Sequence, residues 1–179
     1  AHHPQAVAVA WPYLADPDRF IRWAARVAIE HQPPATWKAR ALAEEKPLAA
    51  LTALLALARA TGVDPFHRVK GSSPPDSAQG ERILLALNKF DWSRLSAEER
   101  LLQARTYQIV LNRFGQPYAE LKKQLIAKLD AIYPCVTREE NDLICNLLVF
   151  LEAPSVAAKT IKLLAEAPTQ EEQIEYARA

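Results

Sequence analysis

Several features are scarce or absent in this sequence of 179 residues, which has no methionine, two cysteines and four glycines. No uninterrupted apolar run approaches the ~18 residues that suggest a membrane span. No basic segment followed by an apolar run and a small-residue cleavage site opens the chain. These absences predict a soluble chain with no membrane span. The lack of a methionine at position 1 predicts that the chain is processed, tagged or excised from a larger protein.

The two cysteines, Cys135 and Cys145, fit no spacing used for zinc binding or haem attachment. A disulfide between them would imply an oxidising compartment. The apolar surroundings of Cys145 instead favour a buried free thiol. The sequence leaves both alternatives open.

The charges are nearly balanced, with 22 Lys and Arg against 21 Asp and Glu and a net charge of +1. No overall field therefore draws the chain towards nucleic acid or an anionic membrane. The sequence also has no nucleophile elbow, no glycine-rich loop after a strand and no H-E-x-x-H motif. We expect no catalytic, cofactor-binding or metal-binding residue in this chain, and no enzymatic activity.

Half of the residues are apolar, and 13 prolines divide the chain into helix-sized segments without strand-like alternation. Helix starts are marked by the Asp16-Pro17-Asp18 turn and by capping boxes that begin at Ser96, Thr137 and Thr169. The segment 63–75 is predicted to be a flexible loop. The pattern predicts one all-α domain over residues 1–179, with helices near 5–15, 16–31, 35–44, 47–60, 76–89, 96–115, 117–133, 137–152, 154–167 and 168–179. The first of these is expected to be bent or ended by Pro12.

Pairing these helices gives units that start near residues 4, 35, 77, 117 and 154. Apart from the shorter first unit, their spacing is close to the ~40–47 residues of HEAT or armadillo repeats. A single helical hairpin exposes too much apolar surface to be stable alone, so it must bury that surface against its neighbours. Helix 137–152 is apolar enough that we expect it to be covered on nearly all sides. The fold is therefore predicted to be a short right-handed α-solenoid of about five HEAT-like helical hairpins.

The segment 14–29 carries a family resemblance, in an aspartate-rich turn followed by Ile21-Arg22 and then Ala25 and Ala28-Ile29. It resembles the second helix of a HEAT repeat. In that family, the residues at the positions of Asp18 and Arg22 brace adjacent repeats. Ile21, Ala25, Ala28 and Ile29 are accordingly expected to face the stack.

A broader resemblance rests on DPDRFIRWAARVAIEHQP at 16–33, LLALARATG at 54–62, LLVFLEAP at 147–154 and APTQEEQIEYA at 167–177. Together these segments are similar to the HEAT-type region of large exported proteins from planctomycetes and related bacteria. Those proteins join a dehydrogenase-type β-propeller to this region and to a c-type cytochrome domain. The resemblance implies a periplasmic or exported location and a linking or docking role, with any haem held elsewhere in the parent protein.

Arg19, Arg22 and Arg26 form one stripe on a helix, at spacings of three and four residues, and such a stripe can bind a phosphate or carboxylate. The alternative is a structural ladder, because Asp18 and Glu30 stand four residues from Arg22 and Arg26. The ladder is the favoured interpretation.

Trp23 lies four residues from Arg19, so the guanidinium can stack on its indole without any ligand. The four tryptophans are concentrated in the first half of the chain, where they either line a groove or, as we prefer, pack between helices. His31 and His67 lack a second ligand at helical spacing and are not expected to bind a metal.

The expected function is a non-catalytic scaffold or protein-interaction module whose partners are proteins or neighbouring domains of the same polypeptide, and not nucleic acid. Two alternatives stay open. A HEAT-like enzyme such as a DNA glycosylase would need a basic concave groove with an acidic residue beside aromatics. A cofactor- or chromophore-handling lyase would need a pocket lined by Trp and His. The oligomeric state is left open.

Overall fold

The computed structural model describes residues 2–71 and 73–178, and this part of the chain is all-helical, with 73% helix and no strand. The all-α prediction is therefore confirmed. Four short 3-10 helices accompany the α-helices, at Trp11–Ala15, Pro34–Thr36, Pro65–His67 and Trp92–Arg94. The α-helices are α1 (Ala6–Ala10), α2 (Arg19–Glu30), α3 (Lys38–Ala43), α4 (Pro47–Thr61), α5 (Ser77–Asn88), α6 (Ala97–Phe114), α7 (Ala119–Ile132), α8 (Arg138–Phe150), α9 (Val156–Glu166) and α10 (Gln170–Arg178).

The chain divides into two compact units, Ala1–Gly115 with α1 to α6 and Gln116–Ala179 with α7 to α10. The prediction of one domain over residues 1–179 stays a prediction. The two units differ in charge. The first has fifteen Lys and Arg against eleven Asp and Glu, a net charge of +4, and the second has seven against ten, a net charge of −3.

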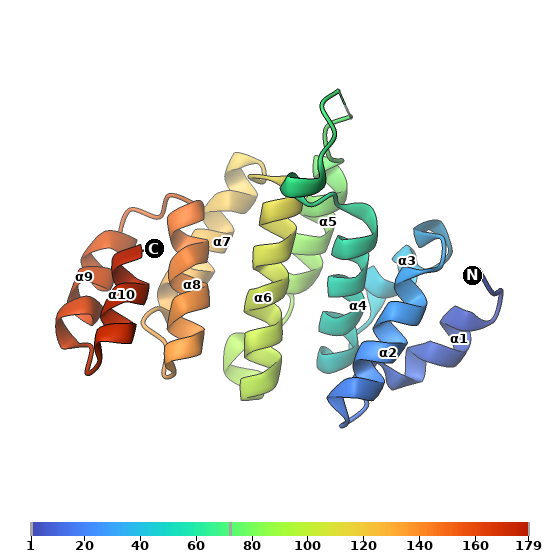
Figure 1. Cartoon of the computed structure of the whole chain (residues 1–179), viewed down its shortest axis with the longest axis horizontal. Coiled ribbons are helices and arrows are strands. Elements are labelled where there is room, and N and C mark those ends of the chain that lie inside the picture. The colour runs from blue at the N-terminus through green and yellow to red at the C-terminus, as the bar shows by residue number, and fades with distance from the viewer. Residues whose placement is uncertain (1, 72, 179) are drawn as a thin grey trace. The chain divides into compact units, whose positions relative to one another are not determined.

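In the first unit, α1 pairs with α2, α3 with α4 and α5 with α6. Helices α2, α4 and α6 lie side by side, with α3 against α5 in a second row (Figure 1). Helix α4 is the centre of this unit, since it contacts α2, α3, α5 and α6. Its leucines Leu51, Leu54 and Leu57 are almost completely buried. Burial on every side explains why α4 has almost no polar face.

One segment passes the length and hydropathy test for a membrane helix, although no span was expected from the sequence. It is Pro47–His67, which contains α4, and 56% of its most apolar window is buried inside the protein. The core helix of a folded domain passes the same test.

Local side-chain caps set the starts of several helices, as predicted. Asp18 accepts a hydrogen bond from the backbone nitrogen of Phe20 at the start of α2. Ser96 and Glu99 form the complete capping box of α6. The Thr137 hydroxyl accepts from the backbone nitrogen of Glu140 at the start of α8. These contacts satisfy backbone N–H groups that have no partner inside the helix.

Helices α5 and α6 approach closely where Gly80 faces Phe114. A Cβ atom at Gly80 would lie 2.6 Å from the Phe114 Cβ and 2.7 Å from its Cγ. Gly62, just after α4, faces the same ring, with its Cβ position 2.7 Å from the Phe114 Cε2. The two glycines therefore make room for this aromatic side chain, and Gly62 itself has an extended backbone rather than a left-handed one.

The second unit is held together by polar contacts as well as by its apolar core. In it, α8 contacts α7, α9 and α10, and α9 contacts α10. Lys159 Nζ donates to Asp130 Oδ1 at 2.8 Å and to the Tyr133 carbonyl at 2.9 Å. The hydrogen bond from Lys159 is the main cause that lowers the pKa of Asp130. The Tyr133 hydroxyl lies 2.9 Å from the Thr160 hydroxyl in the buried interior.

The structure tests several expectations about single helices. The helix expected at 5–15, bent or ended by Pro12, is α1, which ends at Ala10 and is followed by a 3-10 helix from Trp11, because Pro12 cannot donate a backbone hydrogen bond. Ile21 does not face the core and is 42% exposed, whereas Ala25 and Ile29 are buried. Helix α8 is largely covered, with Ile144, Leu147 and Leu148 buried, whereas Val149 and Phe150 at its C-terminal end are 39% and 41% exposed.

Both cysteines are free thiols, and Cys145 is fully buried as expected. The predicted loop at 63–75 contains the 3-10 turn Pro65–His67, followed by residues without regular structure. Residue 72 lies outside the described residues. Within this loop Phe66 is 93% exposed, so its ring has no place in the core.

Candidate functional site

Four of the five residues singled out from the sequence line one depression on the first unit. It has a volume of about 250 Å³ and lies between α2, α4 and α6. Its lining consists of Arg19, Arg22, Trp23 and Arg26 from α2, Thr52 and Leu55 from α4, and Glu98 and Leu102 from α6. The fifth predicted residue, Asp18, is not in the lining.

The helical repeat explains why these side chains share one face. On an α-helix, residues three, four and seven positions apart point the same way, which places the α2 arginines and Trp23 together. Thr52 and Leu55 meet the same condition on α4. Because α4 packs against both α2 and α6, these three faces border the same depression.

Arg22 is fixed in place although it carries a charge. It is 8% exposed, and its Nη1 donates to the carbonyl oxygens of Asp16 at 2.5 Å and Pro17 at 3.1 Å. Its Nη2 forms an ion pair with Glu98. Hydrogen bonds to a charged guanidinium are stronger than neutral ones, and here they offset its burial. Arg22 thus ties the start of α2 to the first turn of α6.

Arg26 shares a carboxylate with a second arginine. It forms an ion pair with Glu30 one turn further along α2, as the sequence predicted. Glu30 also accepts from Arg59 Nε of α4 at 3.0 Å. The predicted structural ladder is therefore confirmed for Arg26.

The ladder is wrong for Asp18, whose partner was expected to be Arg22. The Asp18 carboxylate is held at the helix start, where its Oδ1 accepts from the backbone nitrogen of Phe20 at 2.7 Å. Arg22 is paired with Glu98 instead. A carboxylate at the N-cap satisfies a free backbone N–H, and this local contact replaces the expected pair four residues apart.

Arg19 and Trp23 are the open part of the depression. The Arg19 guanidinium lies 4.7 Å from the ring centroid of Phe20, so it stacks on this ring and not on the Trp23 indole, which the sequence also made available. Among the residues that the structure describes, Arg19 has no ion-pair partner. Trp23 is 59% exposed, unusual for a large aromatic side chain. Both groups are therefore accessible to a ligand.

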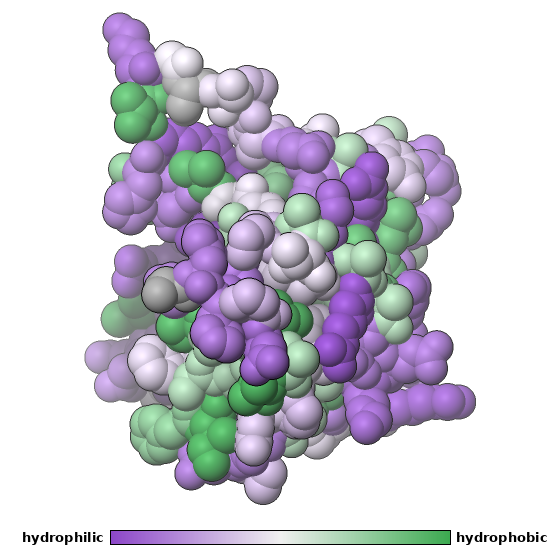
Figure 2. Space-filling view, turned by 90° about the vertical axis from the view of Figure 1, so that its right-hand side faces the viewer, coloured by the Kyte–Doolittle hydropathy of each residue, from purple (hydrophilic) through white to green (hydrophobic). Residues whose placement is uncertain are grey.

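Other apolar side chains are exposed near the start of α2 and on α1. Val9 is 64% exposed, Phe20 66% and Tyr13 49%. Figure 2, which faces the α1 side of the first unit, shows hydrophobic residues gathered along the lower edge of this face. The α1 end of the first unit therefore carries exposed apolar side chains.

Two of the other tryptophans pack in the core, as preferred from the sequence. Trp37 is 1% exposed and donates through Nε1 to the Gln32 carbonyl at 3.2 Å. Trp11 is 4% exposed and donates to Glu44 Oε2 at 2.9 Å. This hydrogen bond is the main cause that lowers the pKa of the Glu44 carboxyl.

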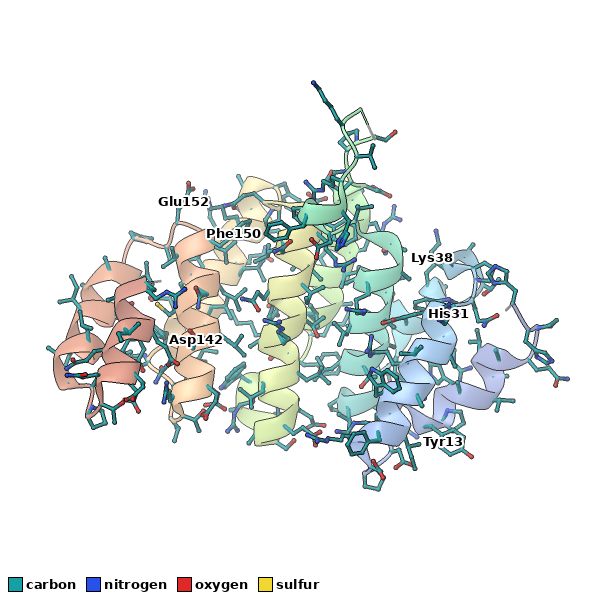
Figure 3. The ribbon with its side chains drawn as sticks, in the orientation of Figure 1. Tyr13, His31, Lys38, Asp142, Phe150 and Glu152 are labelled. Atoms are coloured by element: carbon teal, nitrogen blue, oxygen red, sulfur yellow. The ribbon has the colours of Figure 1, made fainter. Side chains whose placement is uncertain are left out.

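The two histidines considered as metal ligands are exposed, with His31 at the C-terminal end of α2 (Figure 3) and His67 in the loop. Within residues 2–71 and 73–178, no three His, Cys, Asp or Glu side chains gather as a metal site would require.

The second unit has a depression of its own, with a volume of about 360 Å³ and with Cys135, Arg138 and Tyr176 in its lining. Arg138 is already used by Glu175, which accepts from its Nε at 2.7 Å and from its Nη2 at 2.5 Å. This pairing lowers the pKa of Glu175. Because the guanidinium is occupied on two sides, this depression offers less free positive charge than the one on the first unit.

Sequence reasoning missed Leu55, Glu98 and Leu102 as members of the site. They come from α4 and α6, and no local pattern links them to the arginines of α2. The only signal is the predicted stacking of helical hairpins, which places alternate helices side by side.

Comparison of the chain with protein-family models, with curated proteins and with solved structures found no match.

Proposed function

We propose that the chain is an α-solenoid of about five HEAT-like helical hairpins that acts as a non-catalytic scaffold or protein-interaction module. The observation that carries this proposal is the order of helix contacts. In the first unit α1 pairs with α2, α3 with α4 and α5 with α6, while α2, α4 and α6 pack in succession. In the second, α7 pairs with α8, α9 with α10, and α8 packs against α10. Stacked hairpins bury apolar surface in this order.

The open face on the first unit supports an interaction role. Arg19 and Trp23 are exposed there and have no part in the core, while Arg22 and Arg26 hold the surrounding helices. Trp and Arg are the residue types that most often dominate binding energy at protein interfaces. Stacked helices provide an extended surface on which such residues are held rigidly.

The parent protein in this proposal is a larger exported redox protein, on the strength of the sequence resemblance described above. The chemistry then belongs to its propeller and cytochrome domains, and this chain positions them. The residues present here do not fit a c-type haem, because Cys135 and Cys145 are not part of a Cys-x-x-Cys-His sequence and Cys145 is fully buried. Any haem of the parent would be bound elsewhere.

A blot of source-cell extract and periplasmic fraction tests this proposal, with an antibody to this chain and a parallel haem-peroxidase stain. A periplasmic, haem-positive band several times larger than 20.0 kDa would support the role as a spacer in a cytochrome fusion. A haem-negative band near 20.0 kDa would contradict the fusion and leave an interaction module that stands alone.

A further inference from the structure

We propose that the depression between α2, α4 and α6 binds an acidic peptide segment that carries an aromatic or aliphatic side chain. This inference rests on the proposed function as a protein-interaction module, and it names the chemistry of the partner. In the complex, a partner carboxylate lies against Arg19 and Arg22, and the neighbouring apolar side chain lies on Trp23.

The charge of the depression favours a negative ligand. Its lining has three arginines and one glutamate, so the local charge is positive. The first unit as a whole has a net charge of +4. Guanidinium groups bind carboxylates through two parallel hydrogen bonds, which gives orientation as well as attraction. Arg19 is the most accessible of the three and has no ion-pair partner within the described residues.

The apolar part of the lining favours a peptide with a hydrophobic side chain. The Trp23 indole is 59% exposed, and Leu55 and Leu102 form the wall beside it. The volume of about 250 Å³ lies below the roughly 300–1,000 Å³ of typical small-molecule and cofactor sites. A depression of this size suits one or two anchoring side chains of a larger partner better than a whole cofactor.

A nucleic acid is a poorer fit for the same face. Binding to a phosphate backbone needs a continuous track of basic residues that neutralise several phosphates at once. Here Glu98 lies in the lining, and Glu30 is the partner of both Arg26 and Arg59. These carboxylates interrupt the positive surface, whereas one or two carboxylates of a peptide need only one or two free guanidinium positions.

Glu98 acts as an internal competitor for the ligand. Its carboxylate pairs with Arg22, and its side chain is 60% exposed. Only the Glu98 end of this pair is exposed, so an incoming carboxylate can take the place of Glu98 and keep the buried Arg22 charge paired. Removing the negative charge of Glu98 should therefore strengthen binding, while reversing the charge of Arg19 should weaken it. These opposite effects distinguish a specific site from general attraction to a basic surface.

The test is a titration of the full 179-residue chain with the fluorescently labelled peptide acetyl-Glu-Glu-Phe-Glu-Glu-amide, followed by anisotropy at low salt. Arg19→Glu should weaken binding about tenfold or more, and Trp23→Ala about fivefold or more. Glu98→Gln should tighten it by about threefold to tenfold. Arg82 and Glu45 are exposed and lie outside the lining, so Arg82→Glu and Glu45→Gln serve as matched charge controls. Their affinities for the peptide should stay within about twofold of that of wild type.

Four results would overturn the inference. The first is equal binding of the peptide with Gln in place of Glu, and the second is binding that Arg19→Glu leaves unchanged. The third is tighter binding of a single-stranded DNA 12-mer that Arg19→Glu abolishes, which would assign the face to nucleic acid. If neither wild type nor Glu98→Gln binds the peptide, this inference fails, yet the blot described above still decides the proposed function separately.

Discussion

The close approach of α5 and α6 gives a prediction in which local propensity and tertiary packing have opposite signs. The perturbation is Gly80→Ala. Gly80 lies inside α5, where replacing glycine with alanine ordinarily stabilises a helix by about 1 kcal/mol. In this structure the added Cβ would lie 2.6 Å from the Phe114 Cβ and 2.7 Å from its Cγ. We therefore expect the substitution to destabilise the protein.

The magnitude follows from the size of this overlap. Carbon atoms in contact prefer separations of about 3.5–4.0 Å, so the new Cβ is roughly 1 Å too close to two atoms. The Phe114 Cβ is attached directly to the backbone and cannot rotate away, so α5 and α6 must move apart. Overpacking of this kind costs about 1–3 kcal/mol. Because two atoms overlap and one of them cannot rotate away, the upper part of this range applies, about 2–3 kcal/mol. After the gain of about 1 kcal/mol in helix propensity, we expect a net loss of about 1–2 kcal/mol in the free energy of unfolding.

Urea denaturation followed by tryptophan fluorescence measures this loss in the correct part of the chain. All four tryptophans lie in the first unit, together with Gly80 and Phe114. A loss of this size should lower the urea midpoint by roughly 0.5–1 M. The exposed substitution Asn112→Ala in α6 controls for propensity and should raise stability by up to about 0.7 kcal/mol.

A rise in stability with Gly80→Ala, similar to that of Asn112→Ala, would refute the reasoning. It would mean that the two helices are not as close as the structure places them. An unchanged midpoint would also count against the prediction, because the overlap would then cost no more than the propensity gain.

Three further predictions concern single side chains. Arg22→Met should lower the free energy of unfolding by about 1.5–3 kcal/mol because charge-assisted hydrogen bonds are lost. Arg19→Met should change it by less than about 0.5 kcal/mol. Equal effects of the two substitutions in urea denaturation would contradict this prediction. Lys159 lowers the pKa of Asp130, so this stabilisation is complete above the unfolded-state pKa near 4 and is lost as pH falls through the lower folded-state value. Thermal melts should therefore show that Asp130→Asn destabilises at pH 7 and that the difference from wild type shrinks towards pH 2; a constant difference would argue against it. Burial raises the pKa of Tyr107, so absorbance titrations at 295 nm of wild type and Tyr107→Phe should coincide until alkaline unfolding, and an earlier divergence would show that the phenol is accessible.

The sequence predicted best those features that depend on neighbouring residues. The starts of α2, α6 and α8 were correct because Asp18, Ser96 and Thr137 satisfy backbone N–H groups within one helical turn. The break of the first helix at Pro12 was predicted, but the 3-10 form of the segment that follows α1 was not. Propensity alone does not decide between those two forms.

The site was predicted only in part, for a similar reason. The stripe of arginines on α2 is visible as a spacing pattern, and its i, i+4 pair from Arg26 to Glu30 followed directly. The pair from Arg22 to Glu98 joins residues far apart in sequence, and the contact of Arg19 with Phe20 depends on a rotamer choice. Helix packing determines the pair from Arg22 to Glu98, and no periodicity in the sequence encodes this pair.

The most direct test of the interaction role is photo-crosslinking in source cells, with p-benzoylphenylalanine in place of Trp23 in the full-length parent protein. The same group in place of Phe66, which is 93% exposed, serves as the control for exposure alone. The account predicts that position 23 crosslinks to one acidic segment of a partner protein or neighbouring domain, identified by mass spectrometry, and that Glu98→Gln increases the yield. Absence of any crosslink from position 23, or the same products from both positions, would contradict it.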